Sequence, residues 1–141
     1  MTIRFNHVAI SCKDPIATER FYSKHFGFVR ARVIPLGDDQ IVFLRAGDTY
    51  LELFSAEGDR PGPAADADGP HSPGWRHIAF KVDNVDETLA AMGDDAKITL
   101  GPLDFGDFIP GWRTVWVADP DGGIVEISQG FVDEENPPPL A

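Results

Sequence analysis

Two glutamates interrupt apolar stretches of the sequence. Glu52 lies in TYLELF and Glu126 lies in GIVEIS, and each is the sole charged residue of its stretch. Because side chains alternate across a strand, Glu52 shares a face with Tyr50 and Phe54. A carboxylate on a buried face costs on the order of several kcal/mol unless it is paired or ligated. An edge strand facing solvent would explain one such glutamate, whereas two at matching positions indicate a shared chemical role.

Two histidines are placed to act as partners of these glutamates. His7 precedes Glu52 by 45 positions, and His77 precedes Glu126 by 49. Two neutral imidazoles and two carboxylates suit one divalent transition metal, such as nickel, cobalt, zinc, manganese or iron. Their combined charge of about −2 matches such an ion, and octahedral coordination would leave room for water or substrate. A single strand-start histidine is more often structural, but the repetition in register favours a metal site.

The remaining histidines and the cysteine do not repeat in this way. His25 falls in the last turn of a predicted helix, where a cation suits the helix dipole. His71 lies in a linker. Cys12 is one position off the His7 face, so we expect a small buried apolar residue. One cysteine allows no intramolecular disulfide, which fits a reducing cytoplasm.

The elements that must position these residues form the same series twice. Each half reads as a β-α-β-β-β unit, and the fold class is α+β. The first half has predicted strands at 5–11, 29–34, 40–45 and 49–54 and a helix at about 15–26. The second half has predicted strands at 76–82, 97–100, 113–118 and 124–128 and a helix at 85–92.

Capping signals mark both helices. Asp14 can accept at the N-cap before Pro15, and Gly27 stops the first helix. Asn84 and Glu87 have the spacing of a capping box at the second.

We expect one domain made of two modules. The first module covers about 4–55, a Gly- and Pro-rich linker or mobile loop about 56–74, the second module about 75–130 and an acidic tail 131–141. If the two modules pack about a pseudo-twofold axis, the two histidines and two glutamates converge on one concave face.

Charge and hydropathy exclude several partners. The formal net charge is −11 and no basic stripe is present, which argues against nucleic acid and against an anionic membrane surface. No apolar run approaches the roughly 20 residues that span a bilayer, and no signal peptide is expected. We expect a cytoplasmic protein whose partner is a small molecule.

The phrases HVAI, FYSKHFGF and YLELF, with HIAFKVDNVDETLAAM and VADPDGGIVEIS, resemble the vicinal oxygen chelate superfamily. That superfamily contains glyoxalase I, methylmalonyl-CoA epimerase, extradiol dioxygenases, fosfomycin-resistance enzymes and bleomycin-resistance proteins. The resemblance covers about 4–130 and implies the glyoxalase/bleomycin resistance fold, in which the two modules form a curled, barrel-like mixed sheet around a cleft, commonly as a homodimer. It places the metal ligands on His7, Glu52, His77 and Glu126.

The resemblance implies a metal-dependent lyase, isomerase or epimerase of the glyoxalase I type, which transfers a proton next to a chelated carbonyl. Glu126 is the first choice for the base and Glu52 the second. Ser11 occupies the substrate-facing position where glyoxalase I carries an arginine for glutathione, which counts against glutathione. A drug-binding resistance protein would lack the metal set. A ring-cleaving Fe(II) dioxygenase relies on two His and one Glu, so the additional glutamate counts against it.

The segment 101–116, GPLDFGDFIPGWRTVW, is the predicted substrate wall. Phe105, Phe108 and Trp112 offer an apolar lining, and Arg113 could hold a carboxylate or phosphate. In the alternative interpretation the aromatic residues only cap the end of the barrel and Arg113 lies on the surface.

Overall fold

The computed structural model describes residues 1–140, which form two compact units. Unit 1 consists of Met1–Ala64 and Asp119–Gly123, and unit 2 consists of Ala65–Ala118 and the chain from Ile124 onward. The turn at 119–123 connects two strands of unit 2 but belongs to unit 1 by its contacts.

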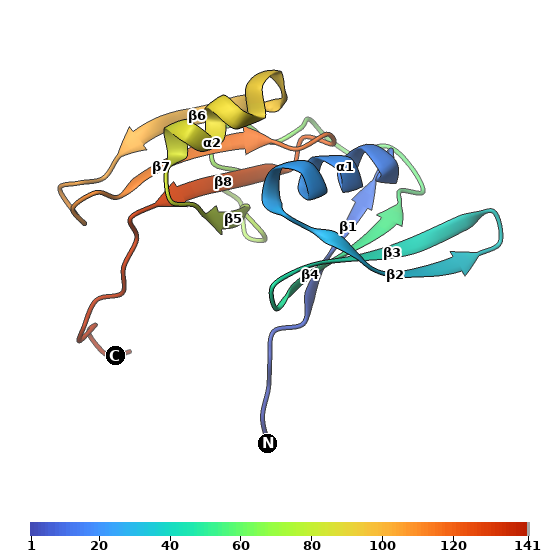
Figure 1. Ribbon diagram of the computed structural model, residues 1–141, viewed down its shortest axis with the longest axis horizontal. Helices are drawn as coiled ribbons and strands as arrows, with labels where there is room; N and C mark the ends of the chain where they lie inside the picture. Colours follow the sequence, from blue (N-terminus) through green and yellow to red (C-terminus); the bar gives the residue numbers. More distant parts are fainter. Residues whose placement is uncertain (141) are drawn as a thin grey trace. The chain divides into compact units, whose positions relative to one another are not determined.

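Unit 1 contains one helix and one four-stranded sheet (Figure 1). Its elements are β1 (His7–Cys12), α1 (Pro15–Phe26), β2 (Val29–Leu36), β3 (Asp39–Ala46) and β4 (Thr49–Ser55). The strand order is β1-β4-β3-β2, with β1 parallel to β4 and the other pairs antiparallel. Helix α1 packs against β1 and β4.

Unit 2 repeats this series. Its elements are β5 (Ile78–Lys81), α2 (Val85–Met92), the 3₁₀ helix η1 (Gly93–Asp95), β6 (Lys97–Asp104), β7 (Arg113–Ala118) and β8 (Ile124–Gln129). The strand order β5-β8-β7-β6 has a parallel pair between β5 and β8. Helix α2 packs against β7 and β8. The predicted α+β class and the repeated β-α-β-β-β order are confirmed, with a separate four-stranded sheet in each unit.

Both helices have the predicted bounds and caps. The Asp14 side chain accepts from the backbone N–H groups of Ile16 and Ala17, and Gly27 ends α1 in the left-handed region at φ 73°. Asn84 accepts from the N–H of Glu87 at the start of α2. These bonds satisfy donors that a helix start leaves without intrahelical partners.

The glutamates lie on the sheet face opposite the helix in each unit. In β4, Leu51 and Leu53 are buried, and in β8, Val125 and Ile127 are buried, while the glutamate between each pair faces the other way. Burial of the aliphatic residues against a helix supplies the core of each unit. The opposite face of each sheet carries the glutamate.

Several strand boundaries differ from the prediction, and two of the differences affect predicted site residues. Strand β5 begins at Ile78, so His77 lies directly before it. Strand β6 continues to Asp104 because its pairing with β7 extends to the Asp104–Arg113 pair, which takes the first part of the predicted substrate wall into the sheet.

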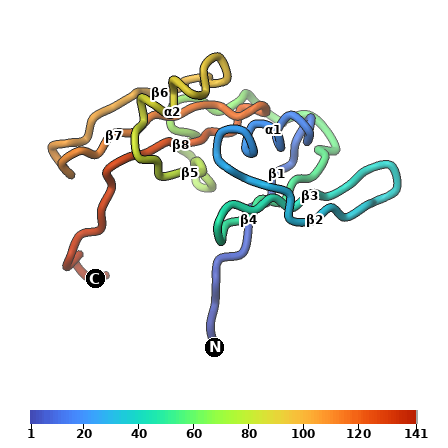
Figure 2. Tube along the Cα trace, viewed as in Figure 1, coloured from blue at the N-terminus to red at the C-terminus, as the bar shows by residue number. Residues whose placement is uncertain are grey.

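After β8 the trace of unit 2 continues to residue 140 without helix or strand (Figure 2). Among residues 1–140, none of the helices has the length and apolar character that crossing a bilayer requires.

Candidate functional site

His7 and Glu52 are brought together in unit 1 by the register of β1 and β4. His7 is paired with Tyr50, so Glu52 lies two residues further along the same face of the neighbouring strand. The His7 Nε2 atom lies 3.1 Å from Glu52 Oε1, and the two side chains are 33% and 16% exposed.

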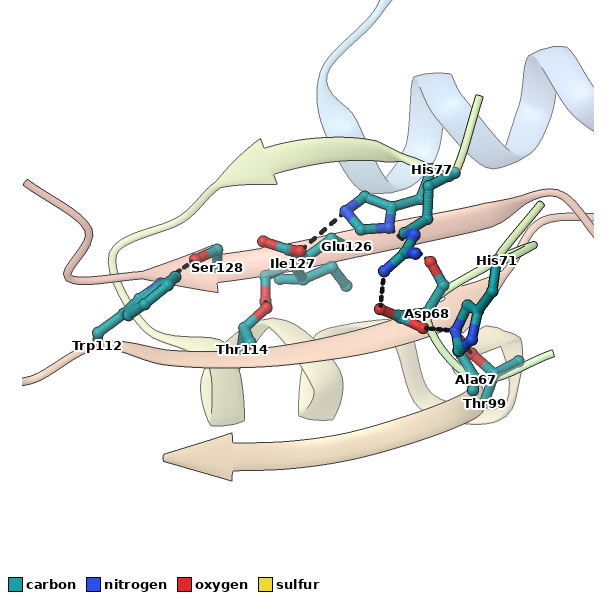
Figure 3. Close-up of polar contacts among 11 residues, drawn as sticks. Ala67, Asp68, His71, His77, Thr99, Trp112, Thr114, Glu126, Ile127 and Ser128 are labelled. Atoms are coloured by element: carbon teal, nitrogen blue, oxygen red, sulfur yellow. Dashed lines mark hydrogen bonds and ion pairs between the residues drawn. The ribbon is translucent and has the colours of Figure 1, made fainter. Parts of the chain in front are cut away.

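His77 and Glu126 are brought together in unit 2 with the same offset. Ala79 is paired with Glu126, and His77 precedes Ala79 by two residues. The His77 Nε2 atom lies 3.0 Å from Glu126 Oε1, and the side chains are 20% and 16% exposed (Figure 3). The sequence prediction that each histidine has a glutamate partner in its own module therefore has a geometric counterpart in both units.

Each pair also has an aromatic neighbour that the sequence interpretation missed. Phe43 is paired with Glu52 across β3 and β4, and its ring centroid lies 5.7 Å from that of His7. Trp116 is paired with Glu126 across β7 and β8, and its ring centroid lies 6.2 Å from that of His77. The signal that could have found them is the residue directly opposite each glutamate on the adjacent antiparallel strand.

The second ring nitrogen of each histidine determines where the proton lies. His77 Nδ1 lies 2.6 Å from the backbone carbonyl oxygen of Asp68, and a carbonyl can only accept, so Nδ1 carries a hydrogen. His7 Nδ1 is bonded to Asn6 Oδ1 in the same sense. In a neutral ring, Nε2 then presents its lone pair to a carboxylate oxygen. Two acceptors at this distance require a positive charge between them, either a second proton or a metal cation.

The separations within each pair fit a shared metal cation. Two ligands at right angles, each with a bond of about 2.1 Å, lie about 3.0 Å apart. Imidazole nitrogen with carboxylate oxygen suits the divalent transition metals that the sequence predicts. Each pair supplies two ligands, and within residues 1–140 no group of three or more His, Cys, Asp or Glu side chains is arranged to hold a metal ion. The four-ligand set stays a prediction.

The predicted aromatic wall is assembled in unit 2. The ring of Phe105 lies 5.0 Å from that of Trp112 and 6.5 Å from that of Phe108. Phe131, which sequence reasoning assigned to the tail, joins them at 5.9 Å from Trp112. Trp112 Nε1 donates to Ser128 Oγ at 3.1 Å, and Ser128 shares a face of β8 with Glu126 (Figure 3). The wall therefore borders the face that carries Glu126.

Arg113 points away from the aromatic wall and from Glu126. Its guanidinium donates to Asp86 Oδ1 at 3.0 Å and to Asp104 Oδ2 at 2.9 Å. The hydrogen bonds to these two carboxylates raise the pKa of Arg113, and the bond to Asp86 has the larger effect. Asp86 belongs to α2, so Arg113 points to the helix-covered face of the sheet, away from Glu126. The structure does not bring Arg113 to the other predicted site residues, because its charge is used inside the module.

Hollows lined by residues of unit 1 lie near two of the predicted site residues. One, of about 380 Å³, adjoins the His7 pair and is lined by Asn6, Phe43, Tyr50, Ala31 and Arg32. Arg32 is paired with Phe43, so it lies on the Glu52 face of the sheet. Ser11 lines the other hollow, of about 530 Å³, together with Lys13 and Arg60. Arg32 was not found by sequence reasoning.

A family model, the Glyoxalase/Bleomycin resistance protein/Dioxygenase superfamily, matches residues 4–127. The chain belongs to this superfamily.

Individual members of the superfamily show the degree of similarity. Mitochondrial methylmalonyl-CoA epimerase of Mus musculus is 27% identical over 105 residues, a match that covers 67% of this chain and 59% of the mouse protein. The chain thus spans less than two thirds of that relative. The crystal structure of a glyoxalase family protein from Enterococcus faecalis is 30% identical, with a TM-score of 0.67 and coverage of 89% of this chain and 96% of that chain. The structure of lactoylglutathione lyase from Agrobacterium tumefaciens is 25% identical, with a TM-score of 0.57 and coverage of 90% and 93%.

Proposed function

We propose that this protein is a metal-dependent enzyme that transfers a proton at the carbon next to a substrate carbonyl, with epimerisation as its reaction. The observation that carries the proposal is the repeated His–Glu pair, with the same register and an N···O separation of 3.1 Å in unit 1 and 3.0 Å in unit 2. The similarity to an epimerase over 67% of the chain supports the choice of reaction.

The proposed ligands of the metal are His7, Glu52, His77 and Glu126. When bound, a divalent ion polarises a carbonyl oxygen and makes the adjacent C–H more acidic. The charge requirement between each Nε2 and its carboxylate oxygen supports this assignment.

Glu126 is the proposed base. Its carboxylate accepts the proton from the substrate carbon, whose electron pair stays on the substrate and is shared with the carbonyl. The aromatic wall next to Glu126, with Trp112 held by Ser128, would exclude water from that proton. Glu52 is the proposed second group, which returns a proton to the opposite side of the same carbon. Glu52 takes the proton that it returns from solvent water, and Glu126 releases its proton to solvent before the next turnover, so protons and charge balance over the cycle.

The substrate is proposed to be an anion, such as an acyl thioester with a carboxylate. Support comes from the hollow beside His7, where the exposed guanidinium of Arg32 is the cation among the lining residues. Methylmalonyl-CoA is the first compound to test. A lactoylglutathione-lyase reaction is the second candidate, supported by the 25% identical structure. Ser11, which replaces the arginine that glyoxalase I uses for glutathione, counts against it.

The test is incorporation of deuterium from D₂O into methylmalonyl-CoA by metal-loaded protein, followed by mass spectrometry. We expect one deuterium per turnover at the carbon between the two carbonyl groups, and loss of exchange with a chelator. Absence of exchange together with conversion of the methylglyoxal–glutathione hemithioacetal would identify a lyase. Oxygen consumption with catechols would identify a dioxygenase. Ligand binding without any of these reactions would identify a binding protein.

We also propose that the protein acts in the cytoplasm as a homodimer. The single, buried cysteine is compatible with a reducing compartment. Light scattering of the purified protein measures the mass directly and would show a monomer if this part of the proposal is wrong.

A further inference from the structure

The segment 66–71, which the sequence presented as part of a linker, is centred on Asp68 and bonded to the His77 site. The Asp68 backbone carbonyl accepts from His77 Nδ1 at 2.6 Å. Its carboxylate accepts from His71 Nε2 at 2.9 Å (Figure 3). It also accepts from Arg76 Nη1 at 3.2 Å. Asp68 is thus tied to Arg76 by its side chain and to the next residue, His77, by its backbone.

The same segment is held by two bonds that do not involve His77, one to β6 and one within the segment. Thr99 Oγ1, on β6, donates to the carbonyl of Ala67 at 2.6 Å, and the N–H of Gly69 donates to the carbonyl of Asp66 at 2.9 Å. Ala67 adopts a φ of +48°, a left-handed conformation that non-glycine residues seldom adopt. The surrounding contacts therefore hold a backbone shape that the chain would not prefer by itself.

Gly69 shows how closely the segment fits against the residue before His77. A Cβ at this position would lie 1.9 Å from the carbonyl oxygen of Arg76, and φ is +112°. Only glycine allows this approach. The carbonyl of Asp68 is consequently set at a fixed place relative to the histidine.

We infer that Asp68 is a positioning residue, which fixes the tautomer and ring orientation of His77 so that Nε2 is free to ligate. The inference rests on the proposed function, in which His77 is a metal ligand. An imidazole has two neutral tautomers, and the acceptor at one nitrogen selects which of them is populated. A backbone carbonyl has no protonation state of its own and accepts at Nδ1 over the whole working pH range. The His71 and Arg76 bonds act by holding the Asp68 backbone in place.

The test is nitrogen-15 NMR of the histidine rings in metal-free protein, at a pH where the rings are neutral. We expect His77 of the wild type to show a single Nδ1–H tautomer. Asp68→Asn weakens both acceptor bonds of the side chain, and Thr99→Val removes the hydroxyl that holds Ala67. Both variants are expected to show a mixture of tautomers at His77 and unchanged signals from His7. Asp66→Asn, which removes an exposed carboxylate from the same segment, is the matched control and is expected to leave His77 unchanged.

The inference is overturned if wild-type His77 is mixed, or if it keeps one tautomer in both variants. Because the rings are observed without metal, this result does not depend on the proposed function. Metal titration of the same proteins separates the two claims. With a metal site present, we expect Asp68→Asn and Thr99→Val to weaken binding by about 10-fold to 100-fold relative to Asp66→Asn. If the wild type binds no metal but the two variants still change the tautomer of His77, the positioning role of Asp68 is kept and the proposed function is contradicted.

Discussion

The His7 and His77 pairs share a register, a separation and an aromatic neighbour, yet they are held in different ways. His7 Nδ1 is bonded to the side chain of the residue beside it, Asn6, whereas His77 Nδ1 is bonded to a backbone carbonyl at Asp68. His7 is also the more exposed ring, at 33% against 20%. The repeated module therefore explains the geometry of the pair, whereas the partner of each Nδ1 atom differs between the two units.

The surroundings of the two pairs also differ in chemistry. The pair in unit 1 adjoins a hollow that Arg32 lines. The pair in unit 2 shares its face with Ser128 and the Trp112 wall. In the proposed enzyme, unit 1 binds the charged end of the substrate and unit 2 provides the dry surface at the reacting carbon. Variants of Glu126, Glu52, Arg32 and Phe108 test this division.

The largest expected effect is on the two glutamates. Glu126→Gln keeps the shape of the side chain but cannot accept a proton, so we expect kcat for deuterium exchange to fall by about 10²-fold to 10⁴-fold at saturating metal. Glu52→Gln is expected to lose less. Full turnover in Glu126→Gln, or a greater loss in Glu52→Gln, would reverse the roles assigned to the two units.

The next effect concerns Arg32. We expect Arg32→Gln to raise KM for methylmalonyl-CoA by about 10-fold to 100-fold, because a hydrogen bond to a charged group contributes about 1.5–3 kcal/mol, with kcat little changed. Arg45→Gln is the control, since Arg45 pairs with Tyr50 on the same sheet face but does not line the hollow. Equal KM values for the two variants would contradict the proposal that Arg32 binds the substrate anion.

A smaller effect is expected at the wall of unit 2. Phe108 is 79% exposed, so Phe108→Ala should leave the melting temperature unchanged. It should raise KM about fivefold, through loss of about 1 kcal/mol of apolar contact. Trp75→Ala, at a site 94% exposed outside the wall, serves as the control for general surface effects. An unchanged KM in Phe108→Ala would leave the wall a structural role only.

The smallest expected effect is on the pH dependence of the free energy of unfolding, and it follows from a difference between the turns before β4 and β8. Asp48 of the first turn is exposed, whereas Asp119 of the second is buried, and burial raises its pKa despite hydrogen bonds from Tyr22 and two backbone N–H groups. The folded protein then holds the Asp119 proton to a higher pH than the unfolded chain, whose Asp titrates near about 3.9. This stabilisation is complete below that pH and is lost as pH rises through the folded pKa of Asp119.

We therefore expect the free energy of unfolding of wild type, relative to Asp119→Asn, to decrease as pH rises above about 4. Chemical denaturation at several pH values measures the difference. A difference that is flat or increases with pH would contradict the assigned direction of the Asp119 shift.

Much of the fold could be predicted because its signals are local. The caps at Asp14 and Asn84 fixed both helix starts, and alternation around Glu52 and Glu126 fixed the last strand of each half. Strand ends were harder: the continued pairing of β6 with β7 brought residues up to Asp104 into the sheet, and no local signal reports pairing.

The site was predictable only where the repeat exposed it. The His–Glu partners were found because they recur. Arg113 was predicted to hold a substrate anion because it is an arginine next to the predicted wall, but its guanidinium is bonded to Asp86 and Asp104. Asp68 left no signal, because its contact with His77 uses a backbone carbonyl that every residue carries. Such contacts depend on tertiary structure and cannot be found from composition or periodicity.

The central claim is that the two His–Glu pairs bind a catalytic metal. It is tested most directly by metal analysis of protein purified without a histidine tag, followed by titration with nickel, cobalt, zinc, manganese and iron(II). We expect about one tightly bound ion per chain, bound more weakly in His77→Gln and in Glu126→Gln, because all four proposed ligands share one ion. A wild type that binds none of these metals tightly, or variants that bind them as the wild type does, would contradict it.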